Sequence, residues 1–67
     1  MKATQKIVFD YLVFFAEAEN RSLMDVTRDI GNKAPQKVNE AYEKLTDLEQ
    51  DQVIYQAAIE YRADELF

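Results

Sequence analysis

The segment IVFDYLVFF, residues 7–15, is apolar or aromatic at every position except Asp10. On a helical wheel at about 100° per residue, residues 4–19 form a helix with one broad apolar arc. The arc contains Ile7, Val8, Tyr11, Leu12, Phe14, Phe15 and Ala18. Beyond it lie Phe9, Val13 and Ala16. Only a narrow polar stripe remains, so the spacing predicts a helix that is apolar nearly all round.

A helix with so much apolar surface has two explanations. It is either the central helix of its domain, wrapped by its own neighbours, or it buries a second face against another chain. A small domain has few elements with which to enclose a helix. We therefore expect Phe9 and Val13 to meet a protein partner or a second copy of the chain, with the central helix as the alternative.

Capping and turn signals divide the next part of the chain. The spacing Ser22-x-x-Asp25 is typical of a capping box, in which the serine oxygen accepts a backbone N–H and the carboxylate reaches back. The apolar residues of this second helix are Leu23, Val26 and Ile30. Gly31 follows as a C-cap, because glycine enters the left-handed conformation without strain. Pro35 suits the first turn of a third helix, whose apolar face is Val38, Ala41, Tyr42 and Leu45.

The boundary between the third helix and a fourth carries no glycine or proline. Thr46-x-x-Glu49 is a second capping-box spacing and predicts a new helix start. Steps of four and three also connect Ala41, Leu45, Leu48, Gln52, Tyr55, Ile59, Arg62 and Leu66. This is the spacing of a coiled-coil seam, so the alternative is one long dimerising helix over residues 35–66. Gln52 and Arg62 suit a seam poorly, and we expect two helices.

Composition agrees with an all-α fold. The 67 residues include one glycine, one proline and neither cysteine nor histidine, so neither a disulfide nor a zinc site is expected to stabilise the fold. A chain this short buries only about 60% of its unfolded surface, and packing or self-association must hold it together. We predict a single helical domain over residues 1–67, a small bundle of three to four helices, with a homodimer as one way to complete it.

Few groups in the sequence suit catalysis. Without histidine or cysteine there is no imidazole base and no thiolate, and a single glycine does not make a phosphate-binding loop. The only serine, Ser22, is better placed as a helix cap. Carboxylates four residues apart, Asp47 with Asp51 and Glu60 with Asp64, are typical of a solvated helix face. We expect no enzymatic activity, no catalytic residue, no cofactor and no metal.

The apolar run at residues 7–15 also bears on location. It is about half the length of roughly 20 residues that a transmembrane helix needs, and Asp10 interrupts it. We expect a cytoplasmic protein with no membrane contact.

The middle of the chain, SLMDVTRDIGNKAPQKVNEAYEKL, is similar to a helix-turn-helix, with a short capped helix, a glycine turn and a second amphipathic helix. Its candidates for DNA contact are Arg28, Lys33 and Lys37. Charge disfavours nucleic acid. Residues 21–44 hold five basic and four acidic residues, a net of +1, but residues 45–67 hold one basic and six acidic, a net of −5. An acidic segment repels phosphate, so a DNA reader and a helix-turn-helix shape used for protein contact both stay open.

The segment LTDLEQDQVIYQAAIEYRADEL, residues 45–66, resembles the signature of the Hha/YmoA family of small enterobacterial nucleoid-associated regulators. The matching residues are Leu45, Thr46, Asp47, Tyr55, Ala57, Ala58, Arg62, Ala63 and Leu66, and Asp10-Tyr11-Leu12 matches the family's N-terminal D-Y-L. The resemblance implies a four-helix protein with little DNA affinity of its own. It also implies docking on the dimerisation region of H-NS, modulation of gene silencing, and a contact role for Asp47. The chain lacks the family's basic, aromatic C-terminal tail.

These observations predict a small acidic helical protein-binding regulator. It would be an adaptor or inhibitor that acts on a transcription or nucleoid protein such as an H-NS-like partner. The expected partner interface consists of Phe9, Val13, Asp47, Asp51, Glu60 and Asp64. The alternatives are a dimeric helix-turn-helix DNA-binding transcriptional regulator and a structural oligomer with no activity beyond assembly.

Overall fold

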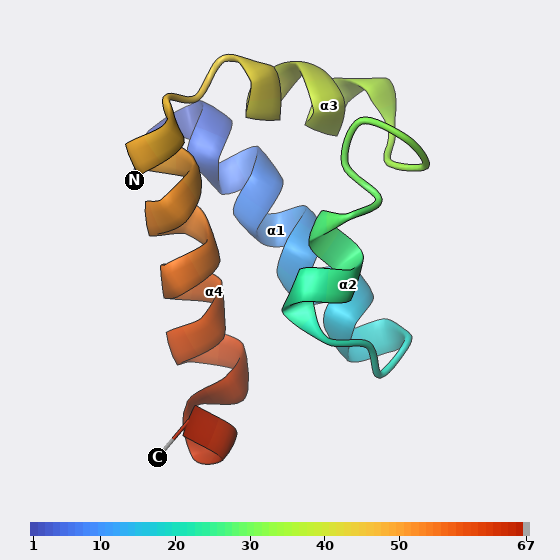
Figure 1. Cartoon of the computed structure of the whole chain (residues 1–67), viewed down its shortest axis with the longest axis vertical. Coiled ribbons are helices and arrows are strands. Elements are labelled where there is room, and N and C mark those ends of the chain that lie inside the picture. Colours follow the sequence, from blue (N-terminus) through green and yellow to red (C-terminus); the bar gives the residue numbers. More distant parts are fainter. Residues whose placement is uncertain (67) are drawn as a thin grey trace.

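A computed structural model shows four helices and, over residues 1–66, no strand (Figure 1). The helices are α1 (Ala3–Ala18), α2 (Leu23–Thr27), α3 (Gln36–Glu43) and α4 (Asp47–Leu66). The structure describes the backbone of residues 1–66 and the side chains of residues 1–61. The predicted all-α fold is confirmed, and so is the expectation of two helices rather than one over residues 35–66.

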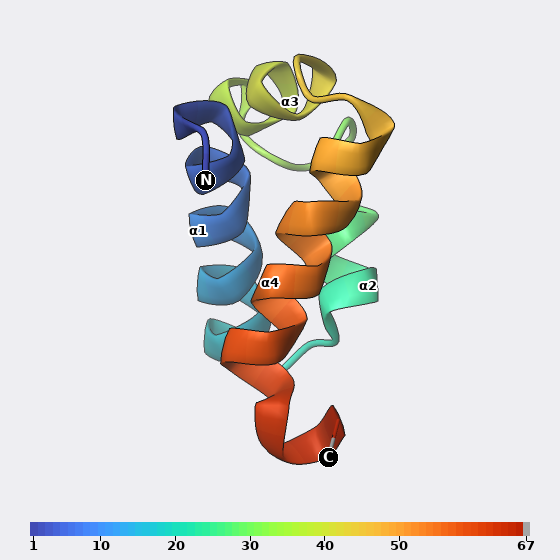
Figure 2. The same ribbon diagram turned by 90° about the vertical axis from the view of Figure 1, so that its left-hand side faces the viewer.

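Helix α1 is the central element of the bundle. It packs against each of the other three helices, and α4 makes its main contact with α1. Figures 1 and 2 show α1 and α4 side by side and running in the same direction, with α3 across their N-terminal ends. Helix α2 packs against both α1 and α4. Because α1 and α4 are parallel, the chain needs α2, α3 and their loops to return from the end of α1 to the start of α4.

The core consists of apolar side chains from all four helices and the loops between them. Its buried residues are Val8, Tyr11, Leu12, Ala16, Leu23, Val26, Ala34, Val38, Ala41, Leu45, Val53 and Ala57. Val8, Leu12, Val26 and Val53 are the largest side chains that are fully buried. The packing of α1 against three neighbours places several of its side chains at the centre of this core.

The buried face of α1 is rotated from the arc that the sequence predicts. Ala16 is fully buried, and Phe9 and Val13 are half-buried against the core. Phe14, by contrast, is 64% exposed, and Ala18 is also exposed. The prediction that Phe9 and Val13 lie beyond the core is therefore wrong. A helical wheel treats all apolar residues alike, whereas burial depends on where α4 docks.

The second helix is shorter than predicted. Ser22 Oγ accepts the backbone N–H of Asp25 at 3.1 Å, as expected of an N-cap, but the Asp25 carboxylate bonds to Arg21 instead of reaching back. The α-helix ends at Thr27, because the next turns use bonds to carbonyls three residues back, such as Ile30 N to Thr27 O at 3.1 Å. Gly31 adopts the expected left-handed conformation, φ 87°, inside these turns.

The break between α3 and α4 is held by the predicted capping box. Thr46 Oγ1 accepts the backbone N–H of Glu49 at 3.2 Å, and the Glu49 carboxylate accepts the backbone N–H of Thr46 at 2.9 Å. These bonds satisfy two N–H groups that a helix start leaves without a partner. Local side-chain chemistry therefore ends one helix and starts the next without glycine or proline.

The connection between α2 and α3 is longer than the turn of the predicted helix-turn-helix. Residues 28–35 connect α2 to α3, which is longer than the turn of about three or four residues in that motif. Both helices pack principally on α1. The helix-turn-helix pattern in the sequence thus produces two helices arranged around a third, because α1 supplies the apolar surface that each of them covers.

Candidate protein-binding face

Helix α4 carries an apolar stripe on the side that faces away from the core. We call it the outer stripe and define it as Leu48, Gln52, Tyr55 and Ile59. Leu48 is 67% and Tyr55 68% exposed, whereas Val53 and Ala57, on the opposite side of the helix, are fully buried. The side of α4 that is turned toward the viewer in Figure 2 is its outer one. The alternating spacing in the sequence therefore corresponds to a real face of α4, and this face lies outside the monomer's core.

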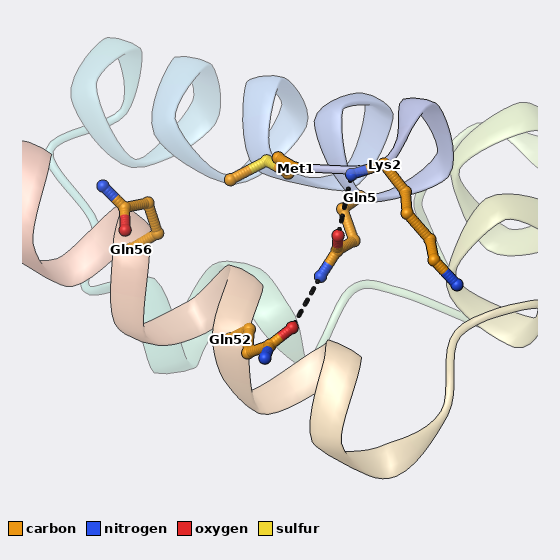
Figure 3. Close-up of a pocket in the computed structure, with 5 residues that line it drawn as sticks. All are labelled: Met1, Lys2, Gln5, Gln52 and Gln56. Atoms are coloured by element: carbon orange, nitrogen blue, oxygen red, sulfur yellow. Dashed lines mark hydrogen bonds between the residues drawn. The ribbon is translucent and has the colours of Figure 1, made fainter.

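A groove of about 570 Å³ borders the outer stripe on the side of α1. Figure 3 shows its lining residues, Met1, Lys2, Gln5, Gln52 and Gln56. The Gln5 side chain is buried and forms three hydrogen bonds. Its carbonyl accepts the backbone N–H of Lys2 at 2.9 Å, and its amide donates to Gln52 Oε1 and to the Glu49 carbonyl, both at 3.2 Å. Gln5 thus joins the start of α1 to the first turns of α4 and positions Gln52 within the stripe.

Phe9 and Val13 lie along the same edge of α1 as Gln5. They follow it at steps of four residues, which keeps side chains on one face of a helix, and Gln5 reaches α4. The Lys6 ammonium lies 5.9 Å from the centre of the Phe9 ring. Both residues are half-buried in the core. Because this packing contributes to folding, Phe9 and Val13 are poorer candidates for a pure interface than the sequence suggested.

Acidic side chains flank the outer stripe. Asp51 is three residues after Leu48 and four before Tyr55, so it adjoins both on the helix surface. Asp47, Asp51 and Glu60 are exposed, and no Lys or Arg side chain described in the structure pairs with them. Glu60 accepts a hydrogen bond from Gln56 at 3.1 Å. The side chain of Asp64, also expected at the interface, lies outside the described residues.

Glu49 differs from the other carboxylates of α4, because it has a structural partner. Its carboxylate pairs with the Lys2 ammonium. The hydrogen bond from Lys2, followed by the backbone bond from Thr46, lowers the pKa of Glu49 below its ordinary value of 4.5. Glu49 therefore ties α4 to the N-terminal end of α1, and the negative charge that remains on α4 is concentrated beside the outer stripe.

Tyr61 fixes the other end of α4. Its hydroxyl donates to the Ala16 carbonyl at 2.9 Å, and its ring packs against the core. The sequence left open whether Tyr55 and Tyr61 are core or interface residues. The structure separates them, because Tyr61 joins α4 to the end of α1 whereas Tyr55 points away from the bundle. No local signal distinguishes two tyrosines at helical spacing.

A second cluster of charges, on the α2 side of the bundle, is structural. The Arg21 guanidinium donates to Glu19 and Asp25 at 2.8 Å and to Asp29 at 2.9 Å. It thereby joins the end of α1, α2 and the turns after α2. The bond from Arg21 lowers the pKa of Asp29 below its ordinary value of 3.8. Arg21 is consequently engaged in holding the fold together and is not available as a free phosphate ligand.

The three residues considered for DNA contact are all exposed. Arg28 follows α2, Lys33 lies in the turns before α3, and Lys37 is in the first turn of α3. None of the three forms an ion pair with another described residue. They come from different elements, and the structure does not present them along one recognition helix.

Within the described part of the chain, no cluster of three acidic residues is arranged to hold a metal ion. None of the described helices combines the length and the apolar character that crossing a bilayer requires.

Comparison with known proteins gives no relative: no family model, no curated protein and no solved structure matches the chain. The resemblance of residues 45–66 to the Hha/YmoA family is thus an expectation that rests on residue pattern alone.

Proposed function

We propose that this protein is a small protein-binding regulator, an adaptor or inhibitor that acts on a transcription or nucleoid protein such as an H-NS-like partner. The observation that carries the proposal is the outer stripe, where Leu48 and Tyr55 are each about two-thirds exposed. The adjacent carboxylates of Asp47 and Asp51 form no ion pair with any side chain among residues 1–61. Large exposed apolar side chains that lie together are typical of interaction sites. The stripe and its acidic flank form the proposed contact surface.

Charge supports a basic protein surface as the partner. The chain has a net charge of −5, and the sequence of α4 contains six acidic residues and one basic residue, Arg62. Complementary charge speeds encounter and selects among partners, while apolar contacts at the centre supply most of the affinity. The same charge weakens contact with a nucleic-acid backbone. A regulator that binds a DNA-binding protein suits this surface better than a protein that reads DNA.

Affinity capture with matched variants tests the proposal. The baits are the wild type, Leu48→Glu and the control Met24→Glu, incubated with a nuclease-treated enterobacterial lysate. Met24 is 61% exposed on α2 and matches Leu48 in exposure. Glutamate in the first turn of a helix is favourable, so Leu48→Glu should keep its helical circular dichroism.

We expect the wild type and Met24→Glu to retain the same regulatory protein at stoichiometric levels and Leu48→Glu to lose it. Titration of purified H-NS with each bait tests the named partner directly. Equal recovery by the wild type and Leu48→Glu, or recovery of no protein by any bait, would contradict the proposal.

A further inference from the structure

The spacing of residues in the outer stripe indicates which secondary structure a bound partner segment has. Leu48, Gln52, Tyr55 and Ile59 follow one another at steps of four, three and four residues. Rows with this spacing accept the side chains of a second helix that crosses at about 20°. A β-strand or an extended peptide has a repeat of two residues and does not match this row. From Leu48 to Ile59 the stripe spans 12 residues, or about 16 Å of helix axis, which is the length of about three turns of a partner helix.

Charge distinguishes a foreign helix from a second copy of α4. A second copy would place Asp47 and Asp51 close to the same residues of the first chain, or to Glu60, and α4 has only one basic residue, Arg62, against six acidic ones. Like charges at the flanks of a helical pair oppose its formation. A helix with lysine or arginine beside its apolar row would instead pair with Asp51 and Asp47 on one flank of the stripe.

Gln52 adds a polar position in the middle of the stripe. It is exposed, and its carbonyl is oriented by the 3.2 Å bond from Gln5. A polar residue at a single seam position fixes the register of two helices at some cost in affinity. A partner helix therefore needs a polar side chain opposite Gln52, with apolar residues before and after it.

We infer that the outer stripe binds one basic amphipathic helix, aligned along α4, whose apolar row is interrupted by a polar residue opposite Gln52. This inference rests on the proposed function, because it names the class of partner element that the same face takes. The two helices pack as in a coiled coil, with Leu48 and Tyr55 supplying the apolar contact. Asp47 and Asp51 select a partner with basic residues beside its apolar row, and Gln52 sets the register.

Two synthetic helical peptides test the inference. Each carries leucines at alternating steps of three and four with one central asparagine. One peptide has lysine at every flanking position and the other has glutamate. Like charges at both flanks prevent each peptide from pairing with itself. Binding to the full chain is measured by fluorescence anisotropy of the labelled peptide at low and at physiological ionic strength.

We expect the basic peptide to bind at least about tenfold more tightly than the acidic one at low salt, with a smaller ratio at physiological salt because of screening. Leu48→Ala combined with Tyr55→Ala should weaken binding about tenfold or more, and Met24→Ala should not change it. Asp47→Lys combined with Asp51→Lys should reverse the preference between the peptides. Glu40→Lys, at an exposed position of α3, is the charge control and should leave that preference in place.

Three results would overturn the inference. They are equal binding of the two peptides, binding that is insensitive to the loss of Leu48 and Tyr55, and a wild-type dimer in sedimentation equilibrium that Leu48→Glu converts to a monomer. If lysate capture still depends on Leu48 while neither peptide binds, the inference fails and the proposed function stands. If the peptides behave as expected but capture is independent of Leu48, the proposed function fails and the inference stands.

Discussion

Helices α1 and α4 lie side by side, and each has more apolar surface than one face requires, but they differ in how much of it is covered. Helix α1 contacts all three other helices, so Phe9 and Val13 are half-buried, and Phe14 is its only large apolar side chain that is mostly exposed. Helix α4 packs mainly on α1, and its outer stripe leaves Leu48 and Tyr55 about two-thirds exposed. The position of a helix in the bundle, rather than its number of apolar residues, decides where an unused apolar face remains.

The same substitution on the two helices should change the free energy of unfolding by very different amounts. Leu12→Ala removes a fully buried side chain of α1 and should lower the free energy of unfolding by about 2–5 kcal/mol, because a cavity replaces packed atoms. Leu48→Ala removes a largely exposed side chain of α4 and should change it by less than about 0.5 kcal/mol. Urea unfolding followed by circular dichroism measures both. Similar losses would mean that the outer stripe is covered in solution.

A second pair of variants compares two phenylalanines of α1. Phe9→Ala should cost about 1–2 kcal/mol of unfolding free energy, because the side chain is partly buried against the core. Phe14→Ala should cost less than about 1 kcal/mol, since it loses chiefly the edge-to-face contact with Phe15, whose ring centre lies 5.1 Å from that of Phe14. Thermal unfolding distinguishes the two. An interface test that uses Phe9→Glu would therefore combine lost binding with lost stability, which is the reason to test Leu48.

The start of α4 can be weakened without touching the core. Thr46→Ala removes the oxygen that accepts the Glu49 N–H and should cost about 1 kcal/mol, the usual value of an N-cap. Thr46→Ser keeps the oxygen and should remain close to the wild type. Denaturant unfolding of the two variants gives the difference. A rise in helicity of Thr46→Ala without loss of stability would instead indicate that α3 and α4 merge into one helix.

Acid should weaken the fold through two carboxylates that hold elements together. The pKa of Glu49 is lowered chiefly by Lys2, and that of Asp29 chiefly by Arg21. A carboxylate with a lowered pKa in the folded state stabilises it fully above its unfolded pKa, and that contribution is lost as pH falls through the folded value. The unfolding free energy should therefore be level between about pH 5 and 8 and decrease below about pH 4.

Two variants, each with one glutamate replaced by glutamine, test whether Glu49 contributes to this acid response. The quantity measured is the urea concentration at the midpoint of unfolding, across the pH range. Glu49→Gln should lower stability at neutral pH and make the decrease in acid shallower. The control Glu43→Gln alters an exposed carboxylate that is not ion-paired with any described residue, and its pH profile should match that of the wild type. A wild-type profile that stays level down to pH 3 would show that neither carboxylate contributes as described.

The sequence by itself determined where most helices of this protein begin and end. The Ser22 and Thr46 caps, the interruption after α1, the left-handed Gly31 and the break before α4 are short-range effects of hydrogen bonding and sterics, so a few neighbouring residues suffice to predict them. The acidic character of the last third and the alternating spacing of Leu48, Gln52, Tyr55 and Ile59 were likewise readable from the chain.

Only the tertiary structure decided which apolar faces are covered. A helical wheel of residues 4–19 does not predict that Ala16 is buried and Phe14 exposed. The spacing of apolar residues in α4 does not show which face of that helix is exposed to solvent. Gln5 was not singled out at all, although it links α1 to α4, because a glutamine in an exposed-looking first turn has no local mark of burial. An apolar side chain gains the same free energy against any apolar surface, so burial follows from how the helices dock and not from the residue itself.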